Sequence, residues 1–254
     1  MSSLIDTGLS VTPDAGKCLV SAEQVILSRI HSSNVGMATW ERKIPRLLSN
    51  WLESISWDCL PHGRFLIKPN DANATLTAML LRSGTPSCKQ ARLFITDAVE
   101  TIFYFSEIAG IKLVDVCVDA VKHDACWKFH RDCVPLRLIT TYLGPGTEYV
   151  APADSDRAIR EQKRFDGIVY QVPQFAVSVF NGSSNADDIG VVHRSPPISG
   201  TGLRRLILCL NMPSATSPPL FKQPRRHSPR CQSVRATGQL ILLGNSTPAV
   251  SLGS

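Results

Sequence analysis

Two residues that could bind a metal ion, His130 and Asp132, lie in the stretch CWKFHRDCVPLRLITTYLGPGTEYV (126–150), where they open a long β-like run. On a strand, residues i and i+2 point to the same face with Cα atoms about 6–7 Å apart, so an imidazole and a carboxylate there can converge on one ion. We expect the third ligand to be His193 in IGVVHRS, because it is the only other histidine inside a β-like run in the second half of the chain.

Two histidines and one carboxylate occupy one face of an octahedron and leave three positions open, which is the arrangement of non-haem Fe(II) sites. The spacing equally allows a hydrogen-bonded His–Asp pair with an unrelated surface histidine. A closed zinc site made of Cys126, His130 and Cys133 is disfavoured, because on a strand the side chain of residue 133 points away from the other two.

Two adjacent arginines, Arg204 and Arg205, stand eleven and twelve residues after His193, at the head of the apolar run LILCL. The planar guanidinium group can hold a carboxylate through two parallel hydrogen bonds. The alternative is a strand-end arginine that extends its charged group to solvent, which suits one of the two. We therefore expect at least one of them to face an anion.

Helices are expected in the first half of the chain. The spacing of apolar residues predicts an amphipathic helix within WERKIPRLLSNWLESISW (40–57), starting near Pro45, and a longer one over 89–110 that ends at Gly110. The shorter elements expected there are a helix within 21–33 and strands at 63–69 and 111–121.

The second half of the chain reads as many short strands separated by Gly- and Pro-containing turns, which predicts an antiparallel sandwich or barrel. The expected strands are RLITTYLG, GTEYVAP, GIVYQV, FAVSVFNG, IGVVHRS and LRRLILCLN. One charged segment, 154–167, interrupts them as a helix or a flexible insert.

The C-terminal part of the chain is the source of the net charge of +6. Residues 1–188 hold 19 basic and 21 acidic residues, whereas 189–254 hold eight basic residues and no acidic one. The Pro- and Ser-rich segment 213–254 cannot bury enough apolar area to order itself, so we expect it to be mostly disordered. Nucleic acid could bind only through this basic tail, by non-specific attraction to phosphates.

The sequence favours a cytoplasmic protein, with a nuclear location as the alternative. With 43% apolar and 19% charged residues, the composition is typical of a soluble globular domain, and no stretch of eighteen apolar residues predicts a membrane span. The N-terminus lacks the basic start and apolar block of a secretory signal. Eight scattered cysteines without a CxxC pair indicate reduced thiols.

The order His-x-Asp, a gap of tens of residues, His, and an Arg about ten residues later resembles the Fe(II)/2-oxoglutarate-dependent oxygenases. More narrowly, FHRD, GPGTE, VHRSP and RRLILCLN together resemble a mainly bacterial family, a domain of unknown function related to that superfamily. The resemblance covers roughly residues 36–212. Trp127-Lys128 and Asn211 depart from the pattern that we expect for that family.

The resemblance implies an α+β protein with a mainly β core, a double-stranded β-helix with N-terminal helices packed on it. It implies Fe(II) held by His130, Asp132 and His193, with 2-oxoglutarate as cosubstrate. Arg205 would hold the distal carboxylate of 2-oxoglutarate, with Arg204 as the alternative. Tyr142 would donate its hydroxyl to the same carboxylate, or simply line the barrel.

The implied domains are an irregular segment (1–35), a helix-buttressed β-helix domain (36–212) and the basic tail (213–254). The implied activity is hydroxylation or demethylation of a substrate, a small molecule or a protein, that the sequence does not identify. The alternatives are a non-catalytic, cupin-like metal-binding protein and an interaction module with a basic tail. Neither the oligomeric state nor the substrate follows from the sequence.

Overall fold

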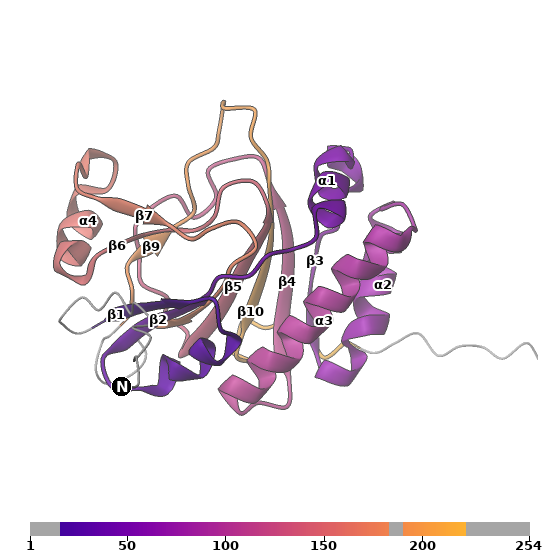
Figure 1. Ribbon diagram of the computed structural model, residues 1–254, viewed down its shortest axis with the longest axis horizontal. Helices are drawn as coiled ribbons and strands as arrows, with labels where there is room; N and C mark the ends of the chain where they lie inside the picture. The colour runs from indigo at the N-terminus through magenta and orange to yellow at the C-terminus, as the bar shows by residue number, and fades with distance from the viewer. Residues whose placement is uncertain (1–15, 183–189, 222–254) are drawn as a thin grey trace, which may run out of the picture. The chain divides into compact units, whose positions relative to one another are not determined.

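The protein is a mixed α+β molecule in which a large, mainly antiparallel sheet is packed between helices and a small second sheet. A computed structural model describes residues 16–182 and 190–221. Three helices cover one face of the large sheet, and the small sheet with one further helix lies over the other face (Figure 1).

The large sheet has seven strands in the order β1-β2-β8-β5-β10-β4-β3. Their bounds are Lys17–Ser21 (β1), Val35–Trp40 (β2), Gly63–Ile67 (β3), Val114–Val121 (β4), Leu136–Leu143 (β5), Val177–Asn181 (β8) and Arg205–Asn211 (β10). All neighbours are antiparallel except β1 and β2, which are parallel. The small sheet contains β7 (Val169–Gln171), β6 (Glu148–Val150) and β9 (His193–Arg194) in that order.

The α-helices are α1 (Arg46–Ser54), α2 (Ala72–Arg82), α3 (Lys89–Ala109) and α4 (Ser155–Glu161). Short 3₁₀ helices lie at Gln24–His31, Trp57–Cys59, Pro69–Asp71, Pro152–Asp154 and Gln162–Arg164. The long helix α3 is capped at its N-terminus by Cys88, whose Sγ accepts a hydrogen bond from the Ala91 N–H, and at its C-terminus by Gly110, which has a φ of 63°. This left-handed residue is the usual helix stop, because glycine adopts it without steric cost.

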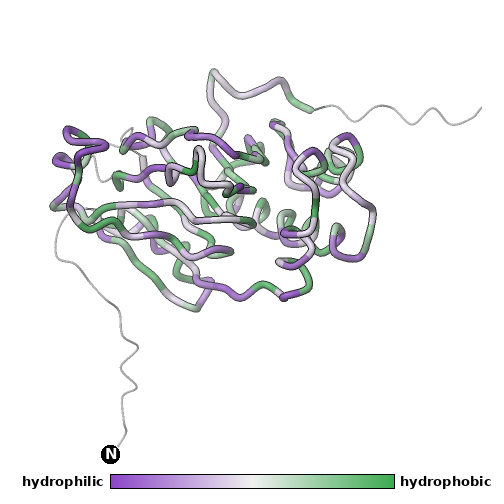
Figure 2. Tube along the Cα trace, turned by 90° about the horizontal axis from the view of Figure 1, so that it is seen from above, coloured by the Kyte–Doolittle hydropathy of each residue, from purple (hydrophilic) through white to green (hydrophobic). Residues whose placement is uncertain are grey.

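Alternate residues of the central strands serve different sides of the large sheet. On β5, Leu136, Leu138 and Tyr142 belong to the core packed under the helices, whereas Arg137 and Ile139 face the side of the small sheet. This alternation follows from the period of two of a β-strand. Hydrophobic and hydrophilic residues accordingly follow one another closely along the chain (Figure 2).

The helices predicted at 40–57 and 89–110 are confirmed as α1 and α3, and Pro45 directly precedes α1. Of the charged segment 154–167, residues 155–164 form α4 and a 3₁₀ turn. The sequence patterns missed α2, β1 and β2. β1 lies inside the N-terminal segment that was expected to be irregular, because it packs with β2 at the edge of the sheet, whereas the helix expected within 21–33 is the 3₁₀ helix Gln24–His31. Residues 222–254 of the expected disordered tail lie outside the described residues.

Within the described part of the chain, each helix is too short or too polar to cross a membrane.

The cysteines that the structure describes are all free thiols, as the sequence predicted. They are Cys18, Cys59, Cys88, Cys117, Cys126, Cys133 and Cys209. The eighth, Cys231, lies outside the described residues.

A buried ion-pair network ties α3 to the chain before α1 and to β5. Arg42 contacts both carboxylate oxygens of Asp97, and the hydroxyl of Tyr142 donates to the same carboxylate. The ring of Tyr142 packs edge-on against Phe94, with centroids 4.8 Å apart. Burial raises the pKa of Tyr142 well above its ordinary value, so the hydroxyl stays protonated and can donate.

We expect Tyr142→Phe to lower the free energy of unfolding by about 1–2 kcal/mol, because the carboxylate of Asp97 loses a charge-assisted donor. Chemical denaturation measures this change. Tyr104→Phe is the matched control, since Tyr104 lies on α3, the helix that carries Asp97, and is 38% exposed. Equal stability of the two variants would contradict the network's role.

Candidate metal centre

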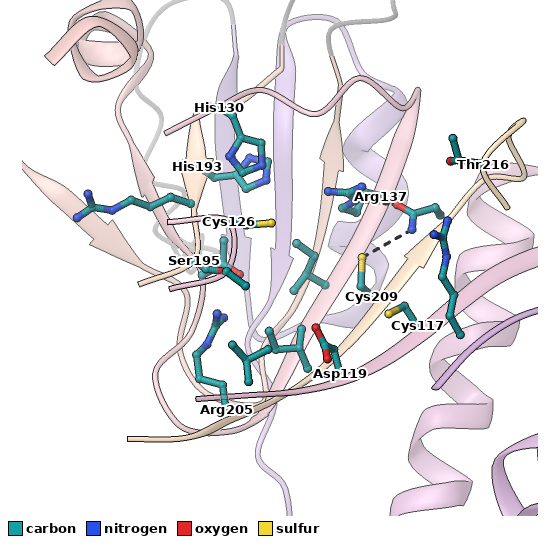
Figure 3. Close-up of a pocket in the computed structure, with 18 residues that line it drawn as sticks. Cys117, Asp119, Cys126, His130, Arg137, His193, Ser195, Arg205, Cys209 and Thr216 are labelled. Atoms are coloured by element: carbon teal, nitrogen blue, oxygen red, sulfur yellow. Dashed lines mark hydrogen bonds between the residues drawn. The ribbon is translucent and has the colours of Figure 1, made fainter. Parts of the chain in front are cut away.

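Two histidines from remote parts of the chain are joined by their own backbones. His130 and His193 form an isolated antiparallel bridge in which each N–H donates to the other's carbonyl oxygen, both at 3.0 Å. Directly paired residues of an antiparallel bridge project their side chains to the same side. The two imidazole rings accordingly lie with their centroids 4.7 Å apart (Figure 3).

Asp132 completes a group of three potential metal ligands. Its Oδ1 lies 3.8 Å from Nε2 of His130, and its Oδ2 lies 3.5 Å from Nε2 of His193. One ligand atom from each residue falls within 4.8 Å of the others, so a single ion can contact all three. Cys126 and Cys133, considered from the sequence as zinc ligands, are not part of this group.

The hydrogen bonds of both imidazoles leave the correct nitrogen for a metal. Nδ1 of His130 lies 2.8 Å from the carbonyl of Lys128, and Nδ1 of His193 lies 2.9 Å from the carbonyl of Val191. A carbonyl accepts only from a protonated Nδ1, so Nε2 of each neutral ring offers its lone pair toward Asp132. Backbone carbonyls that orient histidines in this way are typical of metal sites.

Burial favours the neutral form of His193, the form that binds metals. Its side chain is only 4% exposed, and desolvation together with the neighbouring His130 lowers its pKa, against the attraction of Asp132. Phe180 packs against the same ring, with centroids 4.8 Å apart. The His130 side chain is 36% exposed and forms the solvent-facing side of the group.

Asp132 is buried, and its carboxylate accepts a hydrogen bond from Arg137, a residue that the sequence patterns did not single out. Nη1 of Arg137 donates to Oδ1 of Asp132, and Nε of Arg137 donates to Oδ1 of Asn211 at 2.7 Å. Arg137 thus orients the carboxylate whose second oxygen faces His193. No signal in the sequence pointed to Arg137, because parity counted from His130 and Asp132 puts residue 137 on the opposite face of the expected strand.

The structure corrects the expectation that His130 and Asp132 open a long strand. β5 begins at Leu136, and residues 131–135 form a loop between it and the bridge at His130. Pro135 stands at the junction and has no N–H to donate to a ladder. The two side chains therefore converge through the course of this loop, and the strand spacing that we assumed does not apply.

A glycine allows the Asp132 loop to lie close to the end of β8. A Cβ atom on Gly182 would come within 1.8 Å of the carbonyl oxygen of Val134 and 2.7 Å of that of Asp132. Any side chain at this position would therefore displace the loop that carries the carboxylate.

His130 and His193 border a cavity of about 400 Å³ between the large sheet and the small one, and Arg137, which holds Asp132, lines it as well (Figure 3). Its floor consists of alternate residues of β4, β10 and β5. They are Cys117, Asp119, Val121, Arg205, Ile207, Cys209, Asn211, Arg137 and Ile139. This volume lies within the range of small-molecule sites.

Arg205, one of the two arginines considered as an anion ligand, lines this cavity. The residue is 1% exposed, and its Nε donates to the carbonyl of Pro145 at 2.7 Å. Its Nη1 and Nη2 are buried without a hydrogen-bond partner among the described residues. Burial lowers the pKa of Arg205 to about 10, so the guanidinium remains charged at neutral pH.

The other two residues considered for the cosubstrate point elsewhere. Arg204 donates to the carbonyls of Ile55, at 2.6 Å, and Glu53 at the end of α1, so it is not the arginine of the pocket. The prediction that Tyr142 binds the cosubstrate is wrong, because its hydroxyl is bound to Asp97 on the helical side of the sheet. The parity argument failed there because no unbroken strand connects residue 132 to residue 142.

Comparison with protein families gives one match. A family model described as "Protein of unknown function (DUF1826)" matches residues 21–211. Comparison with curated proteins gives no match.

Solved structures resemble the chain only distantly. Neurospora crassa T7H in complex with alpha-KG has a TM-score of 0.40 and 13% identity, covering 80% of this chain and 86% of that one. AviO1 from Streptomyces viridochromogenes has a TM-score of 0.35 and 13% identity, covering 78% and 97%. A Pseudomonas putida prolyl-4-hydroxylase has a TM-score of 0.30 and 14% identity, covering 68% and 95%. Likeness at this level carries no conclusion about activity.

We expect the purified protein to bind one Fe(II) per chain, and His193→Ala or His130→Ala to abolish the binding, because two remaining ligands hold the ion too weakly. Metal content after dialysis and calorimetric titration measure this. His123→Ala is the matched control, since His123 is an exposed histidine outside the group. Full occupancy in His193→Ala would rule out the three-residue site.

Proposed function

Because this chain belongs to the DUF1826 family, whose description names no reaction, we propose its function from the site itself: an Fe(II)- and 2-oxoglutarate-dependent oxygenase. The substrate would be hydroxylated or demethylated. The observation that carries the proposal is the His130–Asp132–His193 group, whose two histidines line the same cavity as Arg205. The buried Nη atoms of Arg205 have no hydrogen-bond partner in the part of the chain that the structure describes.

The donor set fits Fe(II). Two neutral imidazole nitrogens and one carboxylate leave open positions for a cosubstrate, unlike the closed sets of structural zinc sites. The carboxylate is kept in place by Arg137, and both rings are oriented by backbone carbonyls. His130, Asp132 and His193 would therefore hold the ion.

The environment of Arg205 fits the distal carboxylate of 2-oxoglutarate. A buried guanidinium whose two Nη atoms have no partner carries a large desolvation cost, which a bidentate carboxylate would offset. Its Nε is fixed on the Pro145 carbonyl, so the free edge of the fork has a defined orientation. Arg205 is thus preorganised to bind a carboxylate in the cavity that holds the metal ligands.

With Fe(II), 2-oxoglutarate and O₂ bound, the site would oxidise a C–H bond of the substrate and release succinate and CO₂. The chain's own residues bind and orient. Arg205 would anchor the cosubstrate, and Arg137 keeps Asp132 aligned through a charge-assisted hydrogen bond. Phe180 shields His193 from water. These residues contribute geometry and a dry site.

The sheet arrangement supports a double-stranded β-helix as the fold. Antiparallel strands β8, β5, β10 and β4 form one wall, and β7, β6 and β9 form the facing wall. The His130–His193 bridge lies beside β9, and the cavity opens between the walls.

We expect the iron-loaded protein to form succinate from 2-oxoglutarate under air, even without substrate. Arg205→Met should weaken 2-oxoglutarate binding about 100-fold, since it removes two hydrogen bonds to a charged group. Arg92→Met, an exposed arginine on α3, is the control. Fe(II) binding without succinate formation would instead identify a non-catalytic metal-binding protein.

A further inference from the structure

We propose that the end of the cavity remote from Arg205 binds an anionic group of the substrate, between Arg64 and Arg137. The substrate would then be a small organic acid or a phosphate ester. This inference rests on the proposed function for its chemistry, although the anion site itself consists of other residues. Its parts are two guanidinium groups, a buried carboxylate beneath one of them, and an uncharged floor.

The register of the large sheet places the two guanidinium groups side by side. Arg64 donates to both oxygens of Asp115, through Nε at 2.9 Å and Nη2 at 2.7 Å, while Arg137 is held on Asn211. Asp115 and Asn211 are direct cross-strand partners of β4 and β10. Such partners have Cβ atoms about 4.5–5.5 Å apart, so the arginines above them are neighbours. Figure 3 shows Arg137 beside the Cys117, Cys209 and Thr216 end of the pocket.

This end is separate from the proposed cosubstrate anchor. Arg205 is the first residue of β10 and Asn211 is the last, so their Cα atoms lie about 20 Å apart along the strand. A single small carboxylate cannot contact both ends. An anion bound at Arg64 therefore belongs to a second ligand or to a second group of a longer one.

Each of the two guanidinium groups is held by hydrogen bonds on one edge and has a further N–H group that could bind an anion. Asp115 is 1% exposed and also accepts a hydrogen bond from Ser217 at 2.7 Å, so it holds Arg64 rigidly in place. Nη1 of Arg64 and Nη2 of Arg137 make no hydrogen bond to the residues that the structure describes. Their side chains are 44% and 25% exposed, respectively, and both line the cavity. A fork held on a buried carboxylate loses little entropy when it binds an anion.

The charge around the cavity is balanced in the metal-free protein, so it does not oppose an anion, and a bound metal ion would add to the attraction. The charged residues, other than histidines, that line the described cavity are Arg64, Arg137, Arg194, Arg205 and Asp119. Arg194 is paired with Glu148 at 2.6 Å, and Arg64 with Asp115. The single negative charge of Asp132 balances the charge of Arg137. It cannot also balance the two positive charges of a bound metal ion. The loaded site therefore carries excess positive charge beside Arg137.

The floor next to this end is uncharged. A row of direct cross-strand partners leads away from Arg64 across the sheet. It consists of Cys117, Cys209 and Ile139. Burial raises the pKa of Cys117 to about 11 and that of Cys209 to about 12, so both thiols stay neutral. A carbon chain attached to the anionic group can lie over these side chains within the cavity that His130 and His193 border.

Calorimetric titration of the metal-free protein tests this, with hexanoate, hexyl phosphate and hexanol as probes. We expect one of the two anions to bind and hexanol not to bind. The double variant Arg64→Gln/Asp115→Asn removes the anchor and its buried partner together, and should weaken anion binding about 10- to 100-fold. Arg92→Gln should leave it unchanged. Arg64→Lys keeps the charge without the fork and should cause a smaller loss.

The preferred anion identifies the substrate as an acid or a phosphate ester. The inference is overturned if neither anion binds. It is also overturned if the wild type and the double variant bind equally well while the thermal midpoint of the variant is unchanged. Loss of binding only in Arg205→Met also overturns it, since that places the anion at the other end. His193→Ala should retain anion binding, so failure of this inference is distinguishable from failure of the proposed iron site, which metal content and succinate formation report.

Discussion

The bridge between His130 and His193 is the contact on which the candidate site depends. Two backbone hydrogen bonds, both at 3.0 Å, join segments 63 positions apart in the sequence and turn both imidazoles to one side. The rest of the site is arranged around this contact. Phe180 packs on one ring, and Asp132 reaches Nε2 of both rings from the adjoining loop. Because the bridge is made by the backbone, it fixes the ring positions before any ion binds.

Because side chains alternate between the two faces of the large sheet, one face packs against the helices and the other lines the cavity. On β5, Tyr142 joins the helical side and its network with Arg42 and Asp97, whereas Arg137 turns to the cavity. The adjacent arginines at the start of β10 divide in the same way: Arg204 binds the end of α1, and Arg205 remains buried toward the cavity. One sheet can therefore carry an apolar core on one face and charged groups on the other.

The sequence patterns were most reliable where one local property decides the outcome. The helices of 40–57 and 89–110 followed from apolar periodicity. The end of the second helix followed from Gly110, because glycine readily adopts the left-handed conformation that ends a helix. The short strands β1 and β2 were missed, because they are stabilised by pairing with each other and with β8. Tyr142 was misassigned because its face was counted from a loop residue as if the strand were continuous.

By itself, the sequence determined the types of ligand in the candidate site, since histidines, a carboxylate and a pair of arginines have fixed donor chemistry whatever the fold. It also determined the alternation that sends neighbouring residues to opposite faces. Only the tertiary structure decided which groups meet: that residue 193 lies opposite 130, that Arg137 supports Asp132, and that the partners of Arg64 and Arg137, Asp115 and Asn211, are paired across two strands. The reason is that strand pairing between remote segments depends on the whole sheet's register, which no local pattern encodes.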